Sequence, residues 1–245
     1  MTFQTRILLP VLLTLALSLG AVSRAETPSS NEETAPSNPW PSRAGILGIY
    51  GDAGYYTYGM DEVNNRYLRG RDGSINGGLG YGAGLKFCLS RRFALKGGID
   101  YLFAGTDSTR YVNGVTVTSR VDLPATMIFL GGEYSFLPLG PLDLKLQGGY
   151  LLANIFNGHE RGGDGNSLDL GSVRGTGSGG QAGLGLELNL SPGFSLETDL
   201  DYNFAKISGA TFTGAPADPG SVERDGTVDY SGIVAKIAFN IYFVP

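Results

Sequence analysis

The sequence is poor in the residues that most often carry chemistry. Its 245 residues include one Cys, one His and one Trp, and only 17% are charged. Cys88 has no second cysteine to pair with, so no disulfide can form within the chain. The lysines and arginines are scattered rather than clustered, which excludes the basic patch that nucleic-acid binding needs. We therefore expect no nucleic-acid partner.

The shortage of histidine also weighs against an enzyme. Hydrolysis or acyl transfer usually needs a serine that is activated by a histidine base. The only histidine is His159, beside Glu160 and Arg161, in a stretch where we predict a loop. A mobile loop cannot hold that geometry. We therefore expect no catalytic residue.

Two glycine-rich stretches resemble ligand-binding motifs without meeting their requirements. Residues 175–180 have the glycine spacing of a dinucleotide-binding loop, but a strand rather than a helix is predicted to follow them. Residues 162–170 match a calcium-binding repeat only once, with Ser167 where an aspartate ligand belongs. We expect neither a cofactor nor a metal site.

The N-terminus is typical of an exported protein. Arg6 precedes an apolar run at 7–19, and the small residues Ser23 and Ala25 are spaced like a cleavage site. An anchoring helix is the alternative, but this run is shorter than the roughly 20 apolar residues that a membrane span needs. The predicted divisions are a signal peptide at 1–25, a flexible periplasmic leader at 26–42 and one folded domain at 43–245.

Bulky apolar residues alternate with Gly or polar residues in eight stretches. Ile75 and every odd position from Leu79 to Leu89 are apolar, and the even positions from Gly80 onward are Gly, Lys or Cys. Residues 232–243 repeat the pattern. A period of two indicates a strand with two different faces.

The connections between these stretches alternate in length. Short turns on one side and long loops on the other are typical of outer-membrane barrels, and each stretch has the roughly 9 to 11 residues that a tilted membrane strand needs. The sequence predicts an all-β fold, an eight-stranded antiparallel up-and-down transmembrane β-barrel with its long loops outside the cell. The predicted strands are 45–56, 75–89, 93–105, 120–136, 142–156, 180–190, 194–204 and 232–243. The short connections are 90–92, 137–141 and 191–193, and the long polar ones are 57–74, 106–119, 157–179 and 205–231.

A soluble eight-stranded barrel, such as a lipocalin, shows the same alternation. Its outer face would be charged along its length, whereas the polar face here is mostly glycine with isolated charges, which suits a crowded interior. Aromatic residues also gather near both strand ends, as bilayer interfaces favour. They are Phe87, Phe93, Phe194 and Phe243 near the turns and Tyr55, Phe103, Phe156 and Phe204 near the loops. We infer a barrel in the bacterial outer membrane, surrounded by lipid.

The fourth predicted strand has apolar residues on both parities. Leu123 and Met127 share one parity, and Ile128 and Leu130 share the other. One extra residue exchanges the two faces of a strand, so we predict a β-bulge near Met127 and Ile128.

The polar parity carries charges that we place inside the barrel as a structural network. Folding the second and third strands about their turn sets Lys86 opposite Lys96, and folding the sixth and seventh sets Glu187 opposite Glu197. These strand pairs face each other across a ring of eight, so the lysines should meet and neutralise the glutamates, as buried charges require. The predicted network is Lys86, Lys96, Asp100, Glu133, Glu187, Glu197, Asp199, Asp201 and Lys236, with Asp143 and Lys145 on the same face.

A conducting lumen is the alternative to a plugged one. The interior has more carboxylates than lysines, and this surplus would favour cations in a channel. An eight-stranded barrel, however, has room for little beyond its own side chains. Neutralised pairs across so narrow a lumen would block it, and we favour the plugged interior.

The glycine ladder at 78–87, the repeats at 148–150 and 183–186, and the terminal run at 237–243 resemble the small outer-membrane β-barrel superfamily. That group includes the membrane domain of outer membrane protein A and the opacity-type surface proteins. In this family the final strand ends in an aromatic residue that the barrel-assembly machinery reads, and Phe243 resembles that residue, with Val244 and Pro245 after it.

The resemblance implies a role in envelope integrity, surface adhesion or the passage of small solutes. We expect a structural or surface-interaction role. The expected partners are outer-membrane lipid, the barrel-assembly machinery and any surface ligand that the long loops bind. A narrow channel for small solutes or cations is the alternative, and a lipid-modifying outer-membrane enzyme is the least favoured reading.

Overall fold

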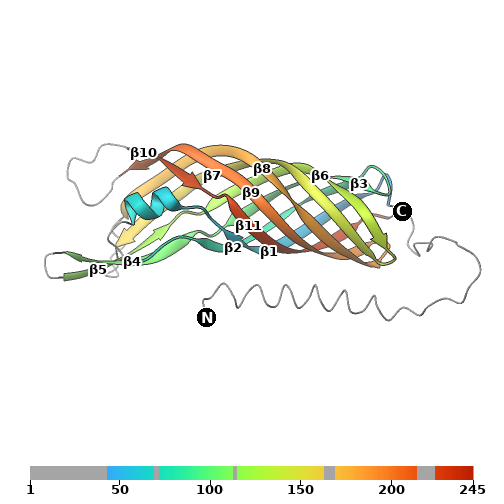
Figure 1. The fold of residues 1–245 in the computed structure, drawn as a ribbon, viewed down its shortest axis with the longest axis horizontal. Coiled ribbons are helices and arrows are strands. Elements are labelled where there is room, and N and C mark those ends of the chain that lie inside the picture. Colours follow the sequence, from blue (N-terminus) through green and yellow to red (C-terminus); the bar gives the residue numbers. More distant parts are fainter. Residues whose placement is uncertain (1–42, 69–71, 113–114, 163–168, 214–223, 245) are drawn as a thin grey trace, which may run out of the picture. The chain divides into compact units, whose positions relative to one another are not determined.

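A computed structural model describes residues 43–68, 72–112, 115–162, 169–213 and 224–244. The predicted signal peptide and leader lie outside these residues. No helix within them is long and apolar enough to cross a bilayer. The elements, drawn in Figure 1, are β1 (Leu47–Thr57), the π-helical turn η1 (Val63–Tyr67), β2 (Gly77–Cys88), β3 (Phe93–Leu102), β4 (Gly105–Val112), β5 (Val115–Asp122), β6 (Ala125–Leu139), β7 (Leu142–Gly162), β8 (Asp169–Ser191), β9 (Phe194–Thr213), β10 (Arg224–Asp229) and β11 (Gly232–Tyr242).

The strands close into one antiparallel ring. β1 pairs with β2 on one side and with β11 on the other, which joins the two ends of the sheet. The order around the wall is β1-β2-β3-β6-β7-β8-β9-β11. β4, β5 and β10 follow or precede wall strands in the chain and lie toward one end of the barrel (Figure 1). The predicted eight-stranded antiparallel barrel is confirmed.

The outer surface of the wall is apolar. On β2, the side chains of Leu79, Tyr81, Leu85 and Phe87 are 40–63% exposed. Ile75, which we predicted on the same face, is instead fully buried before β2 begins. The reason is local: the Asn64 side chain accepts a hydrogen bond from the Ile75 amide (2.9 Å) and donates one to its carbonyl (3.1 Å), which turns this residue inward.

β9 shows where this apolar surface ends. Its outward residues Leu200 and Phe204 are exposed hydrophobic side chains, and the next outward residue, Lys206, is exposed and charged. The inward residues change in the opposite sense, from Asp201 to Ile207, both of which are buried. Both faces of the strand therefore change character within the same few residues.

Three of the four long loops that we predicted are mostly strand. The stretch 106–119 lies largely in the β4–β5 hairpin, 157–179 in the extended ends of β7 and β8, and 205–231 in the end of β9 and in β10. These segments continue the pairing of the wall beyond the apolar band. The fourth stretch, 57–74, contains η1. The polar segments on this side are therefore an ordered β extension rather than loops.

The bulge predicted near Met127 and Ile128 is wrong. β6 pairs in regular register with β3 and β7 through both residues, and the shift lies instead between Ser135 and Leu137. Leu123 and Met127 both point inward and are buried, whereas Ile128 points outward and is 44% exposed. Both parities are apolar because this part of the strand separates lipid from a hydrophobic interior.

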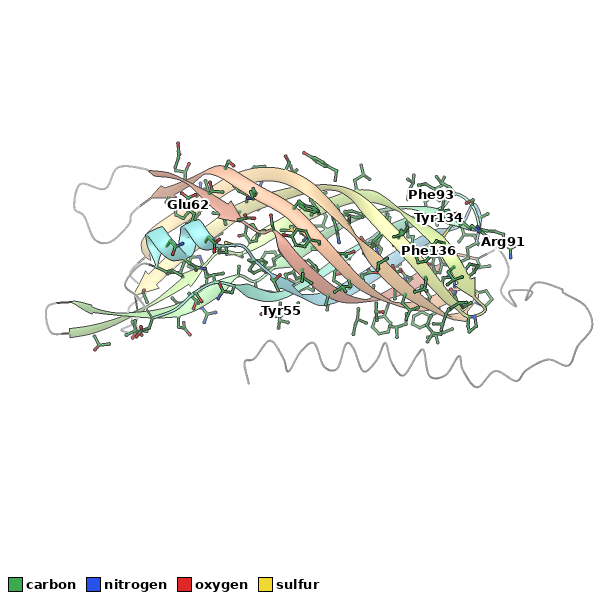
Figure 2. The ribbon with its side chains drawn as sticks, viewed as in Figure 1. Tyr55, Glu62, Arg91, Phe93, Tyr134 and Phe136 are labelled. Carbon is green, nitrogen blue, oxygen red and sulfur yellow. The ribbon has the colours of Figure 1, made fainter. Side chains whose placement is uncertain are left out.

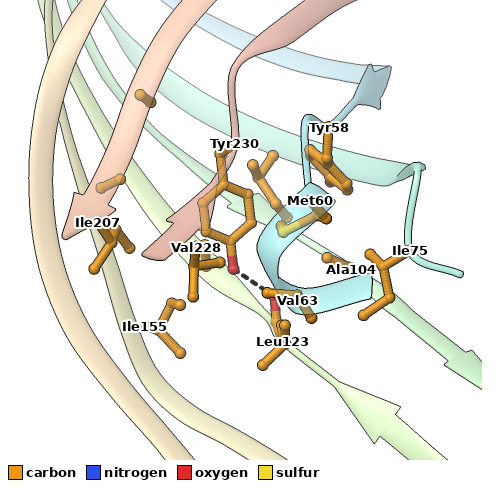
Figure 3. Packing of buried hydrophobic residues seen from close by; sticks show 14 of the residues in the cluster. Tyr58, Met60, Val63, Ile75, Ala104, Leu123, Ile155, Ile207, Val228 and Tyr230 are labelled. Carbon is orange, nitrogen blue, oxygen red and sulfur yellow. Dashed lines mark hydrogen bonds between the residues drawn. The ribbon is translucent and has the colours of Figure 1, made fainter. Parts of the chain in front are cut away.

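That hydrophobic interior fills the extended end of the barrel. The chain between β1 and β2 folds inward, so that Tyr58, Met60 and Val63 lie among side chains from the surrounding strands (Figure 3). The rings of Tyr58 and Tyr230 meet edge to face at 5.4 Å, and the Tyr230 hydroxyl donates to the Leu123 carbonyl at 2.8 Å. η1 and its flanks thus act as an apolar plug, stabilised by burial worth about 1.5–3 kcal/mol per large side chain.

Candidate functional site

A network of buried charges occupies the lumen at the short-turn end. The strand register sets Lys86 of β2 opposite Lys96 of β3, and Glu187 of β8 opposite Glu197 of β9. Because β2 and β3 face β8 and β9 across the ring, the two like-charged pairs point at each other. Each of these four residues is at most 3% exposed.

Each lysine of this network contacts several carboxylates. The Lys86 Nζ lies 2.5 Å from Glu133 Oε2 and 3.0 Å from Glu197 Oε2. The Lys96 Nζ lies 2.9 Å from Glu133 Oε1 and 3.4 Å from Glu197 Oε1. Lys145, which the sequence placed on the same face, forms ion pairs with Glu133, Glu187 and Glu197. These contacts join the ions into one shared network rather than separate pairs. We call this network the lattice; it contains Lys86, Lys96, Lys145, Glu133, Glu187, Glu197 and Asp199.

A second, sparser group lies between the lattice and the apolar plug. The Lys236 Nζ is 3.4 Å from Asp100 Oδ2 and 3.9 Å from Asp52 Oδ2, and these are its only ion pairs among the described residues. Asp100 also accepts a hydrogen bond from the Tyr56 hydroxyl at 2.8 Å. Asp199 belongs to the lattice, because its Oδ2 lies 3.3 Å from the Lys96 Nζ. Asp201 instead accepts hydrogen bonds from the amide side chains of Gln147 (2.7 Å) and Gln181 (2.5 Å).

Arg43 closes the lattice at the mouth of the barrel. Its guanidinium group donates to Glu187 Oε1 (3.0 Å), to Asn189 Oδ1 (2.6 Å) and to the carbonyls of Ser191 and Pro192. The same group lies 3.8 Å from the centre of the Tyr242 ring. Our sequence analysis missed this residue, because Arg43 stands before the first strand and outside any alternating pattern. The only signal in the sequence is that a cation comes just before the first predicted strand. That strand begins at the mouth of the lumen, where carboxylates are abundant.

The sharing of charges explains how so many can be buried together. An isolated buried ion pair often recovers less than its desolvation cost, whereas hydrogen-bonded networks can satisfy each ion several times. The buried members are the lysines 86, 96, 145 and 236 and the carboxylates of Asp52, Asp100, Glu133, Glu187, Glu197, Asp199 and Asp201. The lumen is thus lined by fixed, mutually bound ions.

Three other predicted positions take no part in the ion pairs of this network. His159, which we expected in a mobile loop, lies in β7; its Nε2 is 3.6 Å from Asp122 Oδ2 and its Nδ1 is 3.0 Å from the Asn157 carbonyl oxygen. Asp143 is half-buried at the mouth and accepts a hydrogen bond from Asn189 at 3.0 Å. Phe243 points outward beside the wall, 57% exposed. No group of three or more candidate ligand side chains that could hold a metal occurs in the described part of the chain.

Side chains occupy most of the lumen, and a small cavity remains at its mouth, lined by Arg43, Glu133 and Lys145 among others. Arg43 and the lattice lie at the short-turn end, and the group around Lys236 follows. The apolar plug, formed by η1 and its flanks, packs against Leu123 and Tyr230 at the extended end. The two halves differ in chemistry: one holds paired charges and the other holds apolar side chains. A permeating ion would have to displace bound charges in one half and enter a hydrophobic core in the other.

A family model and one solved structure agree with this fold. The sequence matches the family described as the outer membrane protein beta-barrel domain over residues 12–235. No curated protein sequence matches the chain. Among solved structures, the outer membrane protein OprG from Pseudomonas aeruginosa aligns at 15% identity over 82% of this chain and 97% of its own, with a TM-score of 0.56. A major outer membrane protein from Thermus thermophilus aligns at 13% identity over 80% of this chain and 99% of its own, with a TM-score of 0.48.

Proposed function

Because this chain belongs to the family of outer membrane protein beta-barrel domains, we propose that it is an integral outer-membrane barrel with a sealed lumen that acts through its exposed β extension or as a structural part of the envelope. The observation that carries this proposal is the double filling of the lumen. Either the charge lattice or the apolar plug alone would hinder passage, and the two lie in series.

The energetics of both halves support a sealed interior. Opening the lattice would separate Lys86, Lys96 and Lys145 from buried carboxylates, and breaking buried pairs costs about 3–5 kcal/mol each. Opening the plug would expose the large apolar side chains that cover Leu123, at about 1.5–3 kcal/mol for each. A pathway through the centre would need both changes in the same molecule.

The β extension is the part of the protein that would meet a surface partner. Its hairpin β4–β5 is tied to the wall by pairing of β5 with β7, and its outward side chains include the ion pair of Arg120 with Asp122 at 3.0 Å. A rigid extension presents a fixed surface, which reduces the ordering cost of binding. This supports surface interaction over a purely passive wall.

Phe243 is the residue that we propose the barrel-assembly machinery recognises. An exposed aromatic at the end of the last strand fits the signal that the barrel-assembly machinery reads in the family that the sequence resembles. The Phe243 amide donates to the Leu47 carbonyl at 2.9 Å, so the signal lies beside the β1–β11 seam that closes the barrel. Replacing Phe243 with Ala should lower the folded yield in the outer membrane without changing the stability of the molecules that do fold.

Single-channel recording in planar bilayers tests the sealed lumen. We expect no unitary conductance steps from the folded protein, with a general porin in the same bilayer as the positive control. Steps that disappear when the protein is omitted would overturn the sealed lumen and support the channel alternative.

Whole-cell binding tests the surface role. Cells that carry the full chain are compared with cells in which residues 107–120, 158–172 or 207–228 are replaced by a short Gly/Ser turn, on host-derived and abiotic surfaces. Loss of binding in one replacement locates the contact. Unchanged binding in all three removes adhesion and leaves the structural role.

A further inference from the structure

Two arginines on the β2–β3 turn have no ionic partner in the part of the chain that the structure describes. Arg91 and Arg92 are both exposed, and neither forms an ion pair with another described residue. The other cations at this end, Arg43, Lys86 and Lys145, are all held by buried carboxylates. The turn therefore presents two unneutralised guanidinium groups.

Hydrogen bonds fix the turn that carries them. The Ser90 hydroxyl accepts from the amides of Arg92 (3.3 Å) and Phe93 (3.0 Å), and the Ser90 amide donates to the Phe93 carbonyl at 3.1 Å. The Arg92 carbonyl accepts from the Ser135 amide at 2.7 Å, which ties the turn to β6. The two arginines thus start from a rigid backbone, and binding there would cost little backbone ordering.

Aromatic side chains cover the outer wall next to this turn. Phe93 pairs in register with Tyr134, and Phe136 lies two residues further along β6. All three point outward, with exposures of 39%, 42% and 41%. Figure 2 shows Arg91 at the end of the barrel with these three rings gathered at the same end. The cationic groups at the rim suit a lipid headgroup, and the apolar rings on the wall suit its acyl chains.

We propose that the β2–β3 turn is a binding site for an anionic phospholipid of the periplasmic leaflet. Short turns of such barrels lie on the periplasmic side, where the leaflet consists of phospholipid. The guanidinium groups of Arg91 and Arg92 each present parallel N–H donors that match the oxygens of a phosphate. The acyl chains lie against Phe93, Tyr134 and Phe136.

The charge balance at the site selects an anionic headgroup. A zwitterionic lipid brings its own ammonium group, which cancels part of the attraction to two arginines, whereas phosphatidylglycerol keeps its full negative charge. Of the nearby carboxylates, Glu133 and Glu187 are bound by lysines. Asp143 lines the same cavity as the two arginines and keeps its charge, but among the described residues it forms no ion pair with either of them. This inference does not depend on whether the lumen is sealed.

Lipid binding by the purified full chain tests the site. The folded protein is released from nanodiscs that contain equal amounts of phosphatidylglycerol and phosphatidylcholine, and bound lipids are counted by native mass spectrometry. The variant R91Q/R92Q removes both charges. The control R120Q/K206Q removes two exposed cations from the extended end, both of which have carboxylate partners.

We expect the wild type and the control to retain phosphatidylglycerol in preference to phosphatidylcholine. In R91Q/R92Q the affinity for phosphatidylglycerol should fall roughly tenfold to thirtyfold, the order expected for two arginines near an anionic surface. Equal retention by R91Q/R92Q and the wild type would overturn the proposal. So would displacement of the lipid by millimolar inorganic phosphate, because the site would then take a free anion rather than a lipid.

Discussion

Removal of Lys236 should destabilise the barrel more than removal of Lys86, although Lys86 makes more contacts. Lys86 has three carboxylates within 3.5 Å, whereas Lys236 has two at 3.4 and 3.9 Å. A count of ion pairs would rank the two lysines in the opposite order. What decides the cost is the number of buried carboxylates that are left without a cation.

The difference can be worked out from the neighbours of each lysine. After Lys86→Met, each of its carboxylates keeps another cation: Glu133 and Glu197 keep Lys96, and Glu187 keeps Arg43 at 3.0 Å. After Lys236→Met, neither Asp52 nor Asp100 keeps an ion pair among the described residues. Since breaking a buried pair costs about 3–5 kcal/mol, we expect about 3 kcal/mol for Lys86→Met and about 5 kcal/mol for Lys236→Met.

Guanidinium titration of the barrel folded in phospholipid vesicles measures these costs. The folded fraction is followed by circular dichroism and by the mobility shift of unheated samples on SDS gels. Lys206→Met is the control, because Lys206 pairs with Asp229 at 3.1 Å while its side chain remains 63% exposed, and such pairs contribute less than about 1 kcal/mol. The reasoning is refuted if Lys236→Met costs no more than Lys86→Met, or if neither exceeds the control.

Three further substitutions use the same titration. Arg43→Ala should cost about 1.5–3 kcal/mol through lost hydrogen bonds to a charged group; an unchanged midpoint would show that the mouth is not held by this residue. Leu123→Ala should cost about 2–5 kcal/mol, as in other packed interiors, and no change would mean that water fills the extended end. Gly98→Ala should cost about 1–3 kcal/mol, because a methyl group there overlaps the Tyr50 hydroxyl. Gly51→Ala is its control: the nearest atom is 3.9 Å away, so we expect a change within about 0.5 kcal/mol, and equal effects at both glycines would contradict the steric explanation.

The wall could be predicted from the sequence because membrane strands obey two simple rules. Alternation along β2 separates Leu79 and Phe87 from Lys86, and the tight turn around Arg91 allows one register between β2 and β3. Register then places Lys86 opposite Lys96 without any knowledge of tertiary contacts. Period and turn length are local properties, so a single sequence contains them.

The β extension could not be predicted, because its sequence does not favour strands locally. Gly177 and Gly179 of β8 lie in a Gly/Ser-rich run that is typical of a loop. In the structure, a Cβ at either position would overlap the backbone carbonyl of a β9 residue, Lys206 or Phe204. These glycines therefore permit a close strand approach, which depends on a partner strand that is distant in sequence.

The interior of the extended end was misjudged for a related reason. We explained the apolar residues on both parities by a bulge near Met127, whereas Leu123 and Met127 face a hydrophobic interior. The neighbours of Leu123 come from η1 and from Tyr230, more than 50 residues away on either side. The segment between β1 and β2 folds inward without any periodic pattern in its sequence, so alternation could not predict it. The same holds for Arg43, which precedes the first strand.

Along β9 the polar and apolar faces of the barrel wall exchange places. Up to Phe204 the wall is inverted, with carboxylates such as Asp201 inside and apolar residues outside; beyond Lys206 it is ordered like a water-soluble protein, with Ile207 inside and charge outside. The crossover sets the height of the molecule in the membrane. Sinking by two residues would carry the Lys206 ammonium group into hydrocarbon, and rising by the same amount would expose Phe204 and its neighbours to water. The barrel is therefore held at one depth by its own sequence.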